Sequence, residues 1–404
     1  MRSLALLLAM SLLPRAASAS PQDLFGFGPR AAAMGATGAA FLDDYAAVHA
    51  NPAALSRARG RRLTLGYAGA SFSLRYDGRP VTAENGSATM LGVTVEVPFG
   101  GALRRRVGIG LGFFTPTNVV VRARVRRAET PQFLLLPDRV QCVAIQLGLG
   151  VDVGYGLRVG AGATALAGLT GTVLVTTDGS GRSTSRIDDQ LIANWAPIAG
   201  VSWERGPWRV ALAYRGELLA RFGVTIDAQG IGVPVPVLNI SGVAQYDPHQ
   251  LQLEGAWVRG PWTVALALTG KRWSAFQRVS DATAEGASQP PPLTELHDTV
   301  VVRAGFERRW DLTDRTGFTV RGGAFFEPSP APPPTATRGY LDNDRLALTA
   351  GLAMHAVVGT TRFSADLYGQ FHALLPREGT GANGRAVTYG GTAGVAGMTA
   401  SVDF

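Results

Sequence analysis

The sequence predicts an all-β protein: a transmembrane antiparallel β-barrel of about fourteen strands with an N-terminal hatch inside its lumen. Three observations predict this fold class. Apolar side chains alternate with polar or small ones along most of the chain, connections between the alternating segments are short and long in turn, and the alternation continues to the last residue, Phe404. In hydrocarbon every unpaired backbone N–H or C=O is costly, so a membrane β-structure must close into a barrel.

The first element, residues 1–19, is typical of a secretory signal peptide. Arg2 gives a positive start, an apolar stretch begins at Leu4, and Ala17-Ser18-Ala19 matches an A-x-A cleavage site. A short buried helix is the alternative interpretation. No lipobox cysteine follows, so we expect an exported mature chain without a lipid anchor.

Residues 20–61 form the second element and do not alternate. They are rich in Ala and Gly, and the stretch 29–42 predicts a short helix that ends near Gly35 or Gly38. The lumen of a barrel of this size is wider than side chains can fill. We therefore expect residues 20–61 to be a hatch in the lumen, with a periplasmic extension as the alternative.

Residues 62–404 are the predicted outer-membrane barrel. In 208–224 and in 361–371, apolar residues occupy every second position, which places them on one face of a strand. We expect short turns near 99–104, 154–156, 204–207, 259–261, 311–315 and 358–361. We expect longer connections near 77–87, 124–139, 177–190, 226–248, 276–296, 328–343 and 374–386. Short turns at one end and long loops at the other are typical of outer-membrane barrels.

One stretch leaves the strand count open. Residues 230–246 contain Val233-Pro234-Val235-Pro236 and could be a further strand, but two prolines favour a loop. The loop interpretation leaves an even number of strands, as expected when both chain ends lie on the periplasmic side.

Composition excludes other classes. The 404 residues are 46% hydrophobic and 17% charged, too apolar for a disordered chain. The single cysteine, Cys142, allows neither an internal disulfide nor a cysteine-based zinc cluster. The charge of +8 does not indicate nucleic-acid binding, because the Arg residues are dispersed along the chain. The densest Arg run, within 122–127, is either a contact to lipopolysaccharide phosphates or a solvated loop.

Motifs for enzymatic chemistry are weak. A G-x-G-x-x-A match at 160–165 lies inside a strand-like run with no helix after it, which argues against a dinucleotide site. The five His show no paired metal-ligand spacing. Nothing beyond proximity joins Ser274 and His297 as a lipase pair. We expect no enzyme, no cofactor and no bound metal.

The order and spacing of several motifs resemble the FadL family of outer-membrane transporters of long-chain fatty acids and other hydrophobic compounds. The hatch motif is Asn51-Pro52-Ala53, and the other motifs lie along most of the mature chain. They are Gly28-Pro29-Arg30-Ala31, Met34-Gly35-Ala36, Asp43-Asp44, Gly110-Leu111-Gly112-Phe113-Phe114-Thr115-Pro116, Ala213-Tyr214-Arg215, Trp273-Ser274-Ala275-Phe276, Glu327-Pro328-Ser329-Pro330 and Leu341-Asp342-Asn343-Asp344-Arg345.

The resemblance implies a fourteen-stranded barrel plugged by a hatch, in the outer membrane of a Gram-negative bacterium. It implies passive uptake of long-chain fatty acids or similar hydrophobic molecules, captured at outer loops, held in an apolar lumen pocket and released laterally beside a kinked third strand. We expect a monomer surrounded by outer-membrane lipid and lipopolysaccharide, whose terminal Phe404 is read by the outer-membrane assembly machinery. Nucleic acid is not an expected partner.

Other functions stay open at this point. The barrel could transport aromatic hydrocarbons, because they make similar demands on an apolar pocket. It could instead be a partner in outer-membrane assembly or secretion, or a general diffusion porin, which the hatch-like segment argues against.

Candidate binding residues follow from the chemistry of a fatty acid. Phe133, Leu134 and Leu135 lie in a long predicted loop and are candidates for capture, with packing against neighbouring loops as the alternative. A buried carboxylate needs a cationic partner. The candidates, all on predicted lumen faces, are Arg215, Arg221, Lys271, Arg303 and Arg321. The alternative is that these cations form lumen salt bridges with Glu217, Glu254 and Asp366.

The predicted third strand is the candidate exit. Gly110 and Gly112 weaken a strand and Pro116 lacks a ladder donor, so together they favour a kink or bulge. We therefore expect a lateral gap beside residues 108–118.

Overall fold

The computed structural model describes residues 22–117, 130–133, 135–136, 143–177, 183–230, 238–276 and 293–404. The predicted signal peptide (1–19), the Arg run within 122–127, Cys142 and the two prolines of 231–237 lie outside the described residues.

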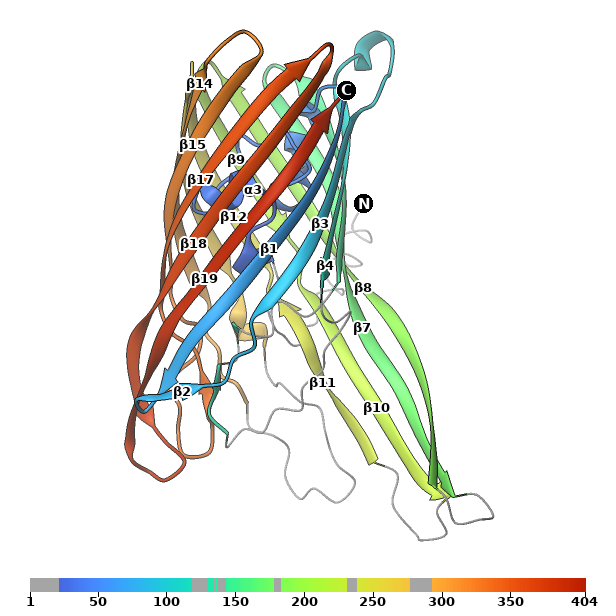
Figure 1. Cartoon of the computed structure of the whole chain (residues 1–404), viewed down its shortest axis with the longest axis vertical. Helices are drawn as coiled ribbons and strands as arrows, with labels where there is room; N and C mark the ends of the chain where they lie inside the picture. The colour runs from blue at the N-terminus through green and yellow to red at the C-terminus, as the bar shows by residue number, and fades with distance from the viewer. Residues whose placement is uncertain are drawn as a thin grey trace, which may run out of the picture.

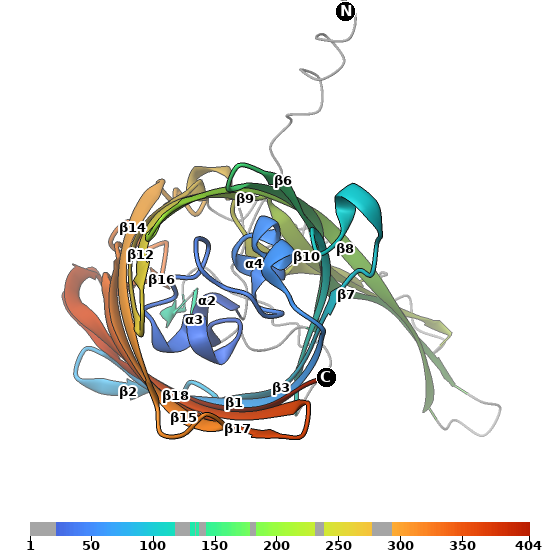
Figure 2. The same ribbon diagram turned by 90° about the horizontal axis from the view of Figure 1, so that it is seen from above.

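The chain forms a closed β-barrel (Figures 1 and 2). Fourteen strands form the wall, each antiparallel to its neighbours in the ring, and the first strand pairs with the last from Arg62–Asp403 to Tyr76–Tyr389. They are β1 (Arg61–Tyr76), β3 (Gly86–Glu96), β4 (Val107–Pro116), β6 (Ala144–Gly154), β7 (Leu157–Thr177), β8 (Ser183–Arg205), β9 (Trp208–Arg215), β12 (Gln250–Arg259), β13 (Trp262–Lys271), β14 (Thr299–Asp311), β15 (Thr316–Glu327), β17 (Arg345–Val358), β18 (Thr361–Thr380) and β19 (Ala386–Asp403). The predicted antiparallel barrel of about fourteen strands is confirmed.

Each wall strand has one apolar outer face and one polar or small inner face. In β12, Leu251 and Leu253 are 52% and 51% exposed, whereas Gln252 and Glu254 between and beside them are buried. The alternation that predicts strands from sequence is therefore the difference between the outside and the lumen of the barrel. Among the described residues, no helix combines the length and apolarity needed to cross a membrane.

The two ends of the barrel differ. The short connections 97–106, 155–156, 206–207, 260–261, 312–315 and 359–360 lie at the end where the C terminus lies, the upper end in Figure 1. We call this the short-turn end. The opposite end, which carries the long connections, is called the long-loop end.

Six of the seven expected long connections contain strand among the described residues, and in three of them it is long, which corrects the sequence prediction. Strand β8 already begins at Ser183, β18 continues to Thr380, and the predicted loop 226–248 contains the end of β10 (Leu218–Gly230) and all of β11 (Leu238–Asp247). Residues 184–193 of β8 are exposed on both faces. A strand that has no buried face shows no alternation, so the sequence pattern ends before the strand does.

The additional strands lie at the long-loop end. Strand β10 pairs with β11 in antiparallel and with β7 in parallel orientation, and these strands project away from the ring together with β8 (Figure 1). Short strand β2 (Arg79–Val81) pairs with β1. A two-stranded sheet joins β5 (Gln132–Phe133) to β16 (Tyr340–Leu341). Single turns of 3₁₀-helix lie at η2 (Gly101–Leu103) and η4 (Trp273–Ala275).

The N-terminal segment, residues 22–58, lies inside the ring of strands (Figure 2). It contains α2 (Gln22–Phe25), α3 (Pro29–Ala33), α4 (Ala47–Ala50) and η1 (Pro52–Arg57). Helix α3 ends just before Gly35, whose φ of 66° is a left-handed conformation that favours glycine. Most apolar side chains of residues 22–58 are fully buried, so this segment and the inner wall form the core of the protein.

Candidate functional site in the barrel lumen

Glycines on the inner face of the wall form the surface against which the N-terminal segment packs. We call this surface the glycine seat. A Cβ added at Gly160 would lie 2.2 Å from the backbone nitrogen of Ala53, and one at Gly200 would lie 1.9 Å from Asn51 Oδ1. Comparable close approaches to the segment occur at Gly92, Gly108, Gly110, Gly112, Gly148, Gly150, Gly305, Gly323 and Gly351. The wall can thus contact the backbone of the segment directly, and any larger side chain here would displace it.

Two polar side chains hold the backbone of the segment. Glu254 is fully buried, and its carboxylate accepts hydrogen bonds from the backbone nitrogens of Gly38 (2.8 Å) and Ala40 (2.9 Å). Asn51 Oδ1 caps η1 by accepting from the nitrogen of Ala53 (3.0 Å), and Asn51 Nδ2 donates to the carbonyl oxygen of Val201 on β8 (3.2 Å). In the hatch motif, Asn51 therefore caps a helix and ties it to the wall, and the Pro52 ring begins that helix.

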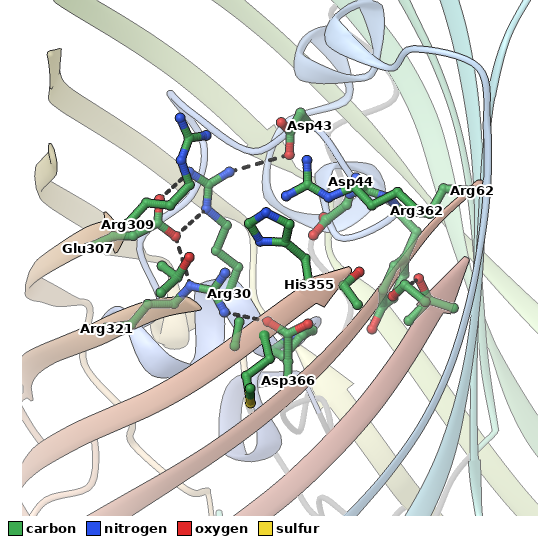
Figure 3. A pocket seen from close by; sticks show the side chains of 18 residues that line it. Arg30, Asp43, Asp44, Arg62, Glu307, Arg309, Arg321, His355, Arg362 and Asp366 are labelled. Atoms are coloured by element: carbon green, nitrogen blue, oxygen red, sulfur yellow. Dashed lines mark hydrogen bonds and ion pairs between the residues drawn. The ribbon is translucent and has the colours of Figure 1, made fainter. Parts of the chain in front are cut away.

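A charged network lines a cavity of about 210 Å³ between the segment and the wall, shown in Figure 3. Arg30 of the segment donates to both oxygens of Glu307 (2.6 and 2.8 Å), and Glu307 also accepts from Arg321 Nε (2.8 Å). Arg321 continues the chain of ion pairs to Asp366. Burial and the repulsion of Asp43 raise the pKa of the neighbouring carboxyl, Asp44.

The end of the segment carries a buried cation. The side chain of Arg57 is 8% exposed, and its nearest acidic oxygen, Glu204 Oε2, lies 3.6 Å from Nε. Its guanidinium nitrogens have no hydrogen-bond partner in the part of the chain that the structure describes. Burial together with the charges of Arg158 and Arg209 lowers the pKa of Arg57 to about 10. Burial of the Arg57 cation opposes docking of the segment in the lumen, whereas the hydrogen bonds of Glu254 and Asn51 favour it.

An aromatic cluster lies toward the long-loop end. Tyr246 stacks on Phe276 with ring centroids 5.9 Å apart and contacts Trp273 at 6.0 Å. The cluster also contains Leu135, Val243, Leu296, Ala331 and Tyr340, all buried. We call these eight residues the aromatic cluster.

A buried cationic group borders the aromatic cluster. Lys271 Nζ lies 2.8 Å from Glu327 Oε1, and Arg345 pairs with the other oxygen of the same carboxylate. The guanidinium groups of Arg303 and Arg345 lie 5.2 and 5.3 Å from the ring centre of Phe325. Lys271, Arg303, Arg345 and Glu327 are all buried. We call these four residues the cation cluster.

The aromatic cluster and the cation cluster meet at Leu135. A small void of about 10 Å³ is lined by Leu135 and Leu136 together with Glu327 and Arg345. Buried Asp342 lines the same void. Arg345 Nη1 is buried without a hydrogen-bond partner among the described residues.

The predicted cations separate into three places. Lys271 and Arg303 belong to the cation cluster. Arg215 and Arg303 both line a void of about 30 Å³ next to the segment, where Arg215 donates to Gln250 Oε1 (2.7 Å) and to the carbonyl of His49 (3.2 Å). Arg321 lies in the charged network near the short-turn end. The side chain of Arg221, on β10, lies outside the described residues.

The predicted capture residues are buried rather than displayed at the surface. Phe133 and Leu135 are 5% and 2% exposed, and Phe133 pairs through β5 with the backbone of β16. Leu134 lies outside the described residues. Phe133 and Leu135 therefore pack against neighbouring segments, which is the alternative that the sequence left open.

The predicted ion-pair partners behave differently from one another. Asp366 pairs with Arg321 as expected, whereas Glu254 binds backbone N–H groups of the segment and Glu217 lies 3.3 Å from His249 Nε2. The sequence did not single out Glu327, Arg345, Trp273 and Phe276 as candidate binding residues. All four lie in motifs that resemble the FadL family, which is the signal that could have singled them out.

The third wall strand, β4, is regular in its described part. It pairs with β3 from Glu96–Gly108 to Ala88–Pro116 and with β6 from Val107–Val151 to Phe114–Ala144, without a register shift. A Cβ at Gly110 would meet Val48 at 2.6 Å, and one at Gly112 would meet Phe27 at 2.3 Å. The interpretation of these glycines as a kink is therefore corrected: they make room for the N-terminal segment. Cys142, which the register places opposite Pro116, lies outside the described residues.

Comparisons with solved structures identify the fold. No protein-family model and no curated protein sequence matches the chain. A FadL homologue from Pseudomonas aeruginosa matches with a TM-score of 0.61 and 16% identity, over 93% of this chain and 97% of that one. The toluene transporter TodX from P. putida matches with a TM-score of 0.57 and 15% identity, over 95% and 99%. The toluene transporter TbuX from Ralstonia pickettii gives 0.56 and 17%, over 95% and 99%.

These likenesses cover nearly the whole length of both chains at low identity, so they are likenesses of fold. The FadL-type fold expected from the motifs is confirmed at that level. Two of these three structures are toluene transporters.

Proposed function

We propose that the chain mediates passive uptake of hydrophobic molecules across the outer membrane of a Gram-negative bacterium. In this proposal the long-loop end faces the exterior, the short-turn end faces the periplasm, residues 1–19 are a cleaved signal peptide, and residues 20–61 are a hatch that closes the lumen. The protein has no enzymatic role.

The observation that carries the proposal is the junction of the aromatic cluster with the cation cluster. An apolar solute that replaces buried aromatic contacts gains about 25 cal/mol per Å² removed from water. Next to it lies the buried guanidinium of Arg345, whose Nη1 has no hydrogen-bond partner among the described residues, which suits the head group of an amphiphile that brings a negative charge.

The preferred substrate class is a long-chain fatty acid. A neutral aromatic hydrocarbon would use the aromatic cluster but would leave Arg345 Nη1 without a hydrogen-bond partner among the described residues. Toluene transporters are among the structures of the same fold, so neutral hydrocarbons are the second candidate.

Parallel uptake assays with a radiolabelled long-chain fatty acid and with toluene distinguish the two. In cells that produce the Arg345→Met variant, we expect fatty-acid uptake to fall at least about tenfold while toluene uptake stays near wild type, because only the carboxylate needs the cation. Since this variant leaves Glu327 less compensated, the charge-neutral pair R345M/E327Q is measured beside it. Equal loss of both substrates in both variants would refute the head-group role.

Lateral release beside the third strand is part of the proposal. Pro116, which lies in β4 and has no backbone N–H to donate to the ladder, supports an exit in this part of the wall. Replacing Pro116 with Val restores a ladder donor and should slow release into the membrane. Unchanged fatty-acid uptake by the P116V variant would contradict this position for the exit.

An assembly or secretion partner is the competing class of function. A stable protein that co-purifies with the barrel, together with normal uptake in a deletion strain, would favour it over transport.

A further inference from the structure

A second apolar surface lies on the outside of the wall, away from the lumen. A groove of about 500 Å³ crosses the outer faces of β3, β4, β6 and β7. Its apolar lining includes Val93, Ile109, Leu111, Leu147, Leu149 and Ala163. Ile109, Leu147 and Leu149 are 43%, 45% and 44% exposed.

The groove opens outward. Gly108, Gly110 and Gly148 alternate with its lining residues along the strands, and a Cβ on any of these three would enter the N-terminal segment in the lumen. Successive side chains of a strand point to opposite faces, so Ile109, Leu111 and Leu147 point away from the lumen. In a membrane this surface meets lipid hydrocarbon.

The β3–β4 connection, residues 97–106, stands beside the groove at the short-turn end. In Figure 2 it projects outside the ring of strands. It displays Phe99 and Leu103 at 48% and 46% exposure, followed by the consecutive exposed residues Arg104, Arg105 and Arg106. Ile109 follows Arg106 by three residues, so about 10 Å separates the cationic group from the first lining residue of the groove.

The charge of this connection is largely uncompensated. Arg105 lies 3.6 Å from Glu96, whereas no ion pair of Arg104 or Arg106 occurs among the described residues. The other acidic group nearby, Asp152, pairs with Arg158 at 3.2 Å. Apolar side chains and unpaired guanidinium groups on one projecting loop match the boundary between acyl chains and phosphates.

We propose that the groove and the β3–β4 connection form a binding site for one anionic glycerophospholipid of the leaflet at the short-turn end. One acyl chain lies in the groove, Phe99 and Leu103 enter the leaflet, and the phosphate accepts hydrogen bonds from Arg104 and Arg106. The occupant is a membrane lipid rather than free phosphate, because the groove opens to hydrocarbon and contributes apolar contact only. This site rests on the proposed membrane location but is independent of the substrate and of transport.

Native mass spectrometry of the full-length barrel, titrated with phosphatidylglycerol or phosphatidylethanolamine from mixed micelles, tests the site. We expect the wild type to retain one phosphatidylglycerol preferentially and the R104Q/R106Q variant to bind it about tenfold more weakly, with the preference over phosphatidylethanolamine lost. The matched control is R259Q/R315Q, which removes two exposed arginines from other positions at the same end, the last residue of β12 and the β14–β15 turn, and should bind as the wild type does.

The acyl-chain half of the site has its own variant. Ala163→Leu fills the groove from its outer face and should weaken binding of the same lipid, whereas Ala365→Leu adds the same bulk to the outer face of β18 and should not. Equal phosphatidylglycerol binding by wild type and R104Q/R106Q, or equal weakening by R259Q/R315Q, overturns the proposal. So does displacement of the bound lipid by glycerol phosphate alone, which would make the site a phosphate site. A fatty-acid uptake assay of the same variants separates this outcome from failure of the transport function, because lipid binding is measured without transport.

Discussion

Replacing Glu254 with Gln tests whether the N-terminal segment is held in the lumen through its backbone. The native carboxylate accepts from the nitrogens of Gly38 and Ala40 and from Gln252 Nε2, all within 3.1 Å. A glutamine keeps one acceptor oxygen but turns an NH₂ group toward a backbone N–H. Hydrogen bonds to a charged group contribute about 1.5–3 kcal/mol each. Losing one to two of them should weaken docking by about 3 kcal/mol, roughly a hundredfold in the fraction of molecules with the segment released.

Hydrogen–deuterium exchange of the peptide that covers residues 35–42 measures this directly. We expect E254Q to exchange faster at the Gly38 and Ala40 amides, while strand amides of β12 keep their protection. The control is Glu217→Gln, which alters a lumen carboxylate that contacts His249 and not the segment. Wild-type exchange at Gly38 and Ala40 in E254Q would refute the reasoning, because it would mean that packing alone holds the segment.

Three further predictions concern the same segment. Gly200→Val should displace it, because its Cβ would lie 1.9 Å from Asn51 Oδ1, whereas Gly255→Val, with no atom within 4 Å of its Cβ, should leave the melting temperature unchanged; equal melting temperatures for both would contradict the seat. Deletion of residues 20–55 should leave an open barrel that admits small polar dyes, and a dye permeability equal to wild type would argue against a hatch. Because burial and its acidic neighbour raise the pKa of Asp44, docking should be tightest at acid pH and weaken as pH rises through that raised pKa. Asp44→Asn should remove this dependence, as measured by single-barrel conductance from about pH 4 to about pH 8; a pH dependence unchanged from wild type would exclude Asp44 as its origin.

The fold was predictable because the wall of a barrel is a repeated local pattern. The alternation of Leu251, Gln252 and Leu253 is enough to predict which side chains face outward and which face the lumen. The short turns are predicted where this alternation is interrupted. The projecting strands β8, β10 and β11 were only partly predictable, since side chains that are exposed on both faces carry no periodic signal.

The glycines show the limit of local reasoning. In the sequence, Gly110 and Gly112 suggest flexibility of their own strand. In the structure they face Val48 and Phe27, about sixty to ninety residues away along the chain, and the small side chain is required by that contact. A contact between distant segments cannot be read from the composition of one of them.

The candidate site was predictable in kind but not in pairing. Lumen-facing cations such as Lys271 and Arg321 follow from strand period, yet their partners depend on which strands face one another across the interior. Glu327 and Arg345 are opposite each other on the neighbouring strands β15 and β17, but Lys271, on β13, reaches the same carboxylate past β14, which strand period alone does not predict.

The glycine seat also restricts the order in which the protein can assemble. The segment contacts β4, β6, β7 and β8 on one side and β15, β17 and β18 on the other, so it occupies the full width of the ring. A finished ring closed by β1 and β19 would have to admit this width through an end or through a broken seam. The segment precedes β1 in the chain and is therefore present from the start of strand pairing. We therefore expect the wall strands to pair with one another around the segment. The pairing between β1 and β19 should form last.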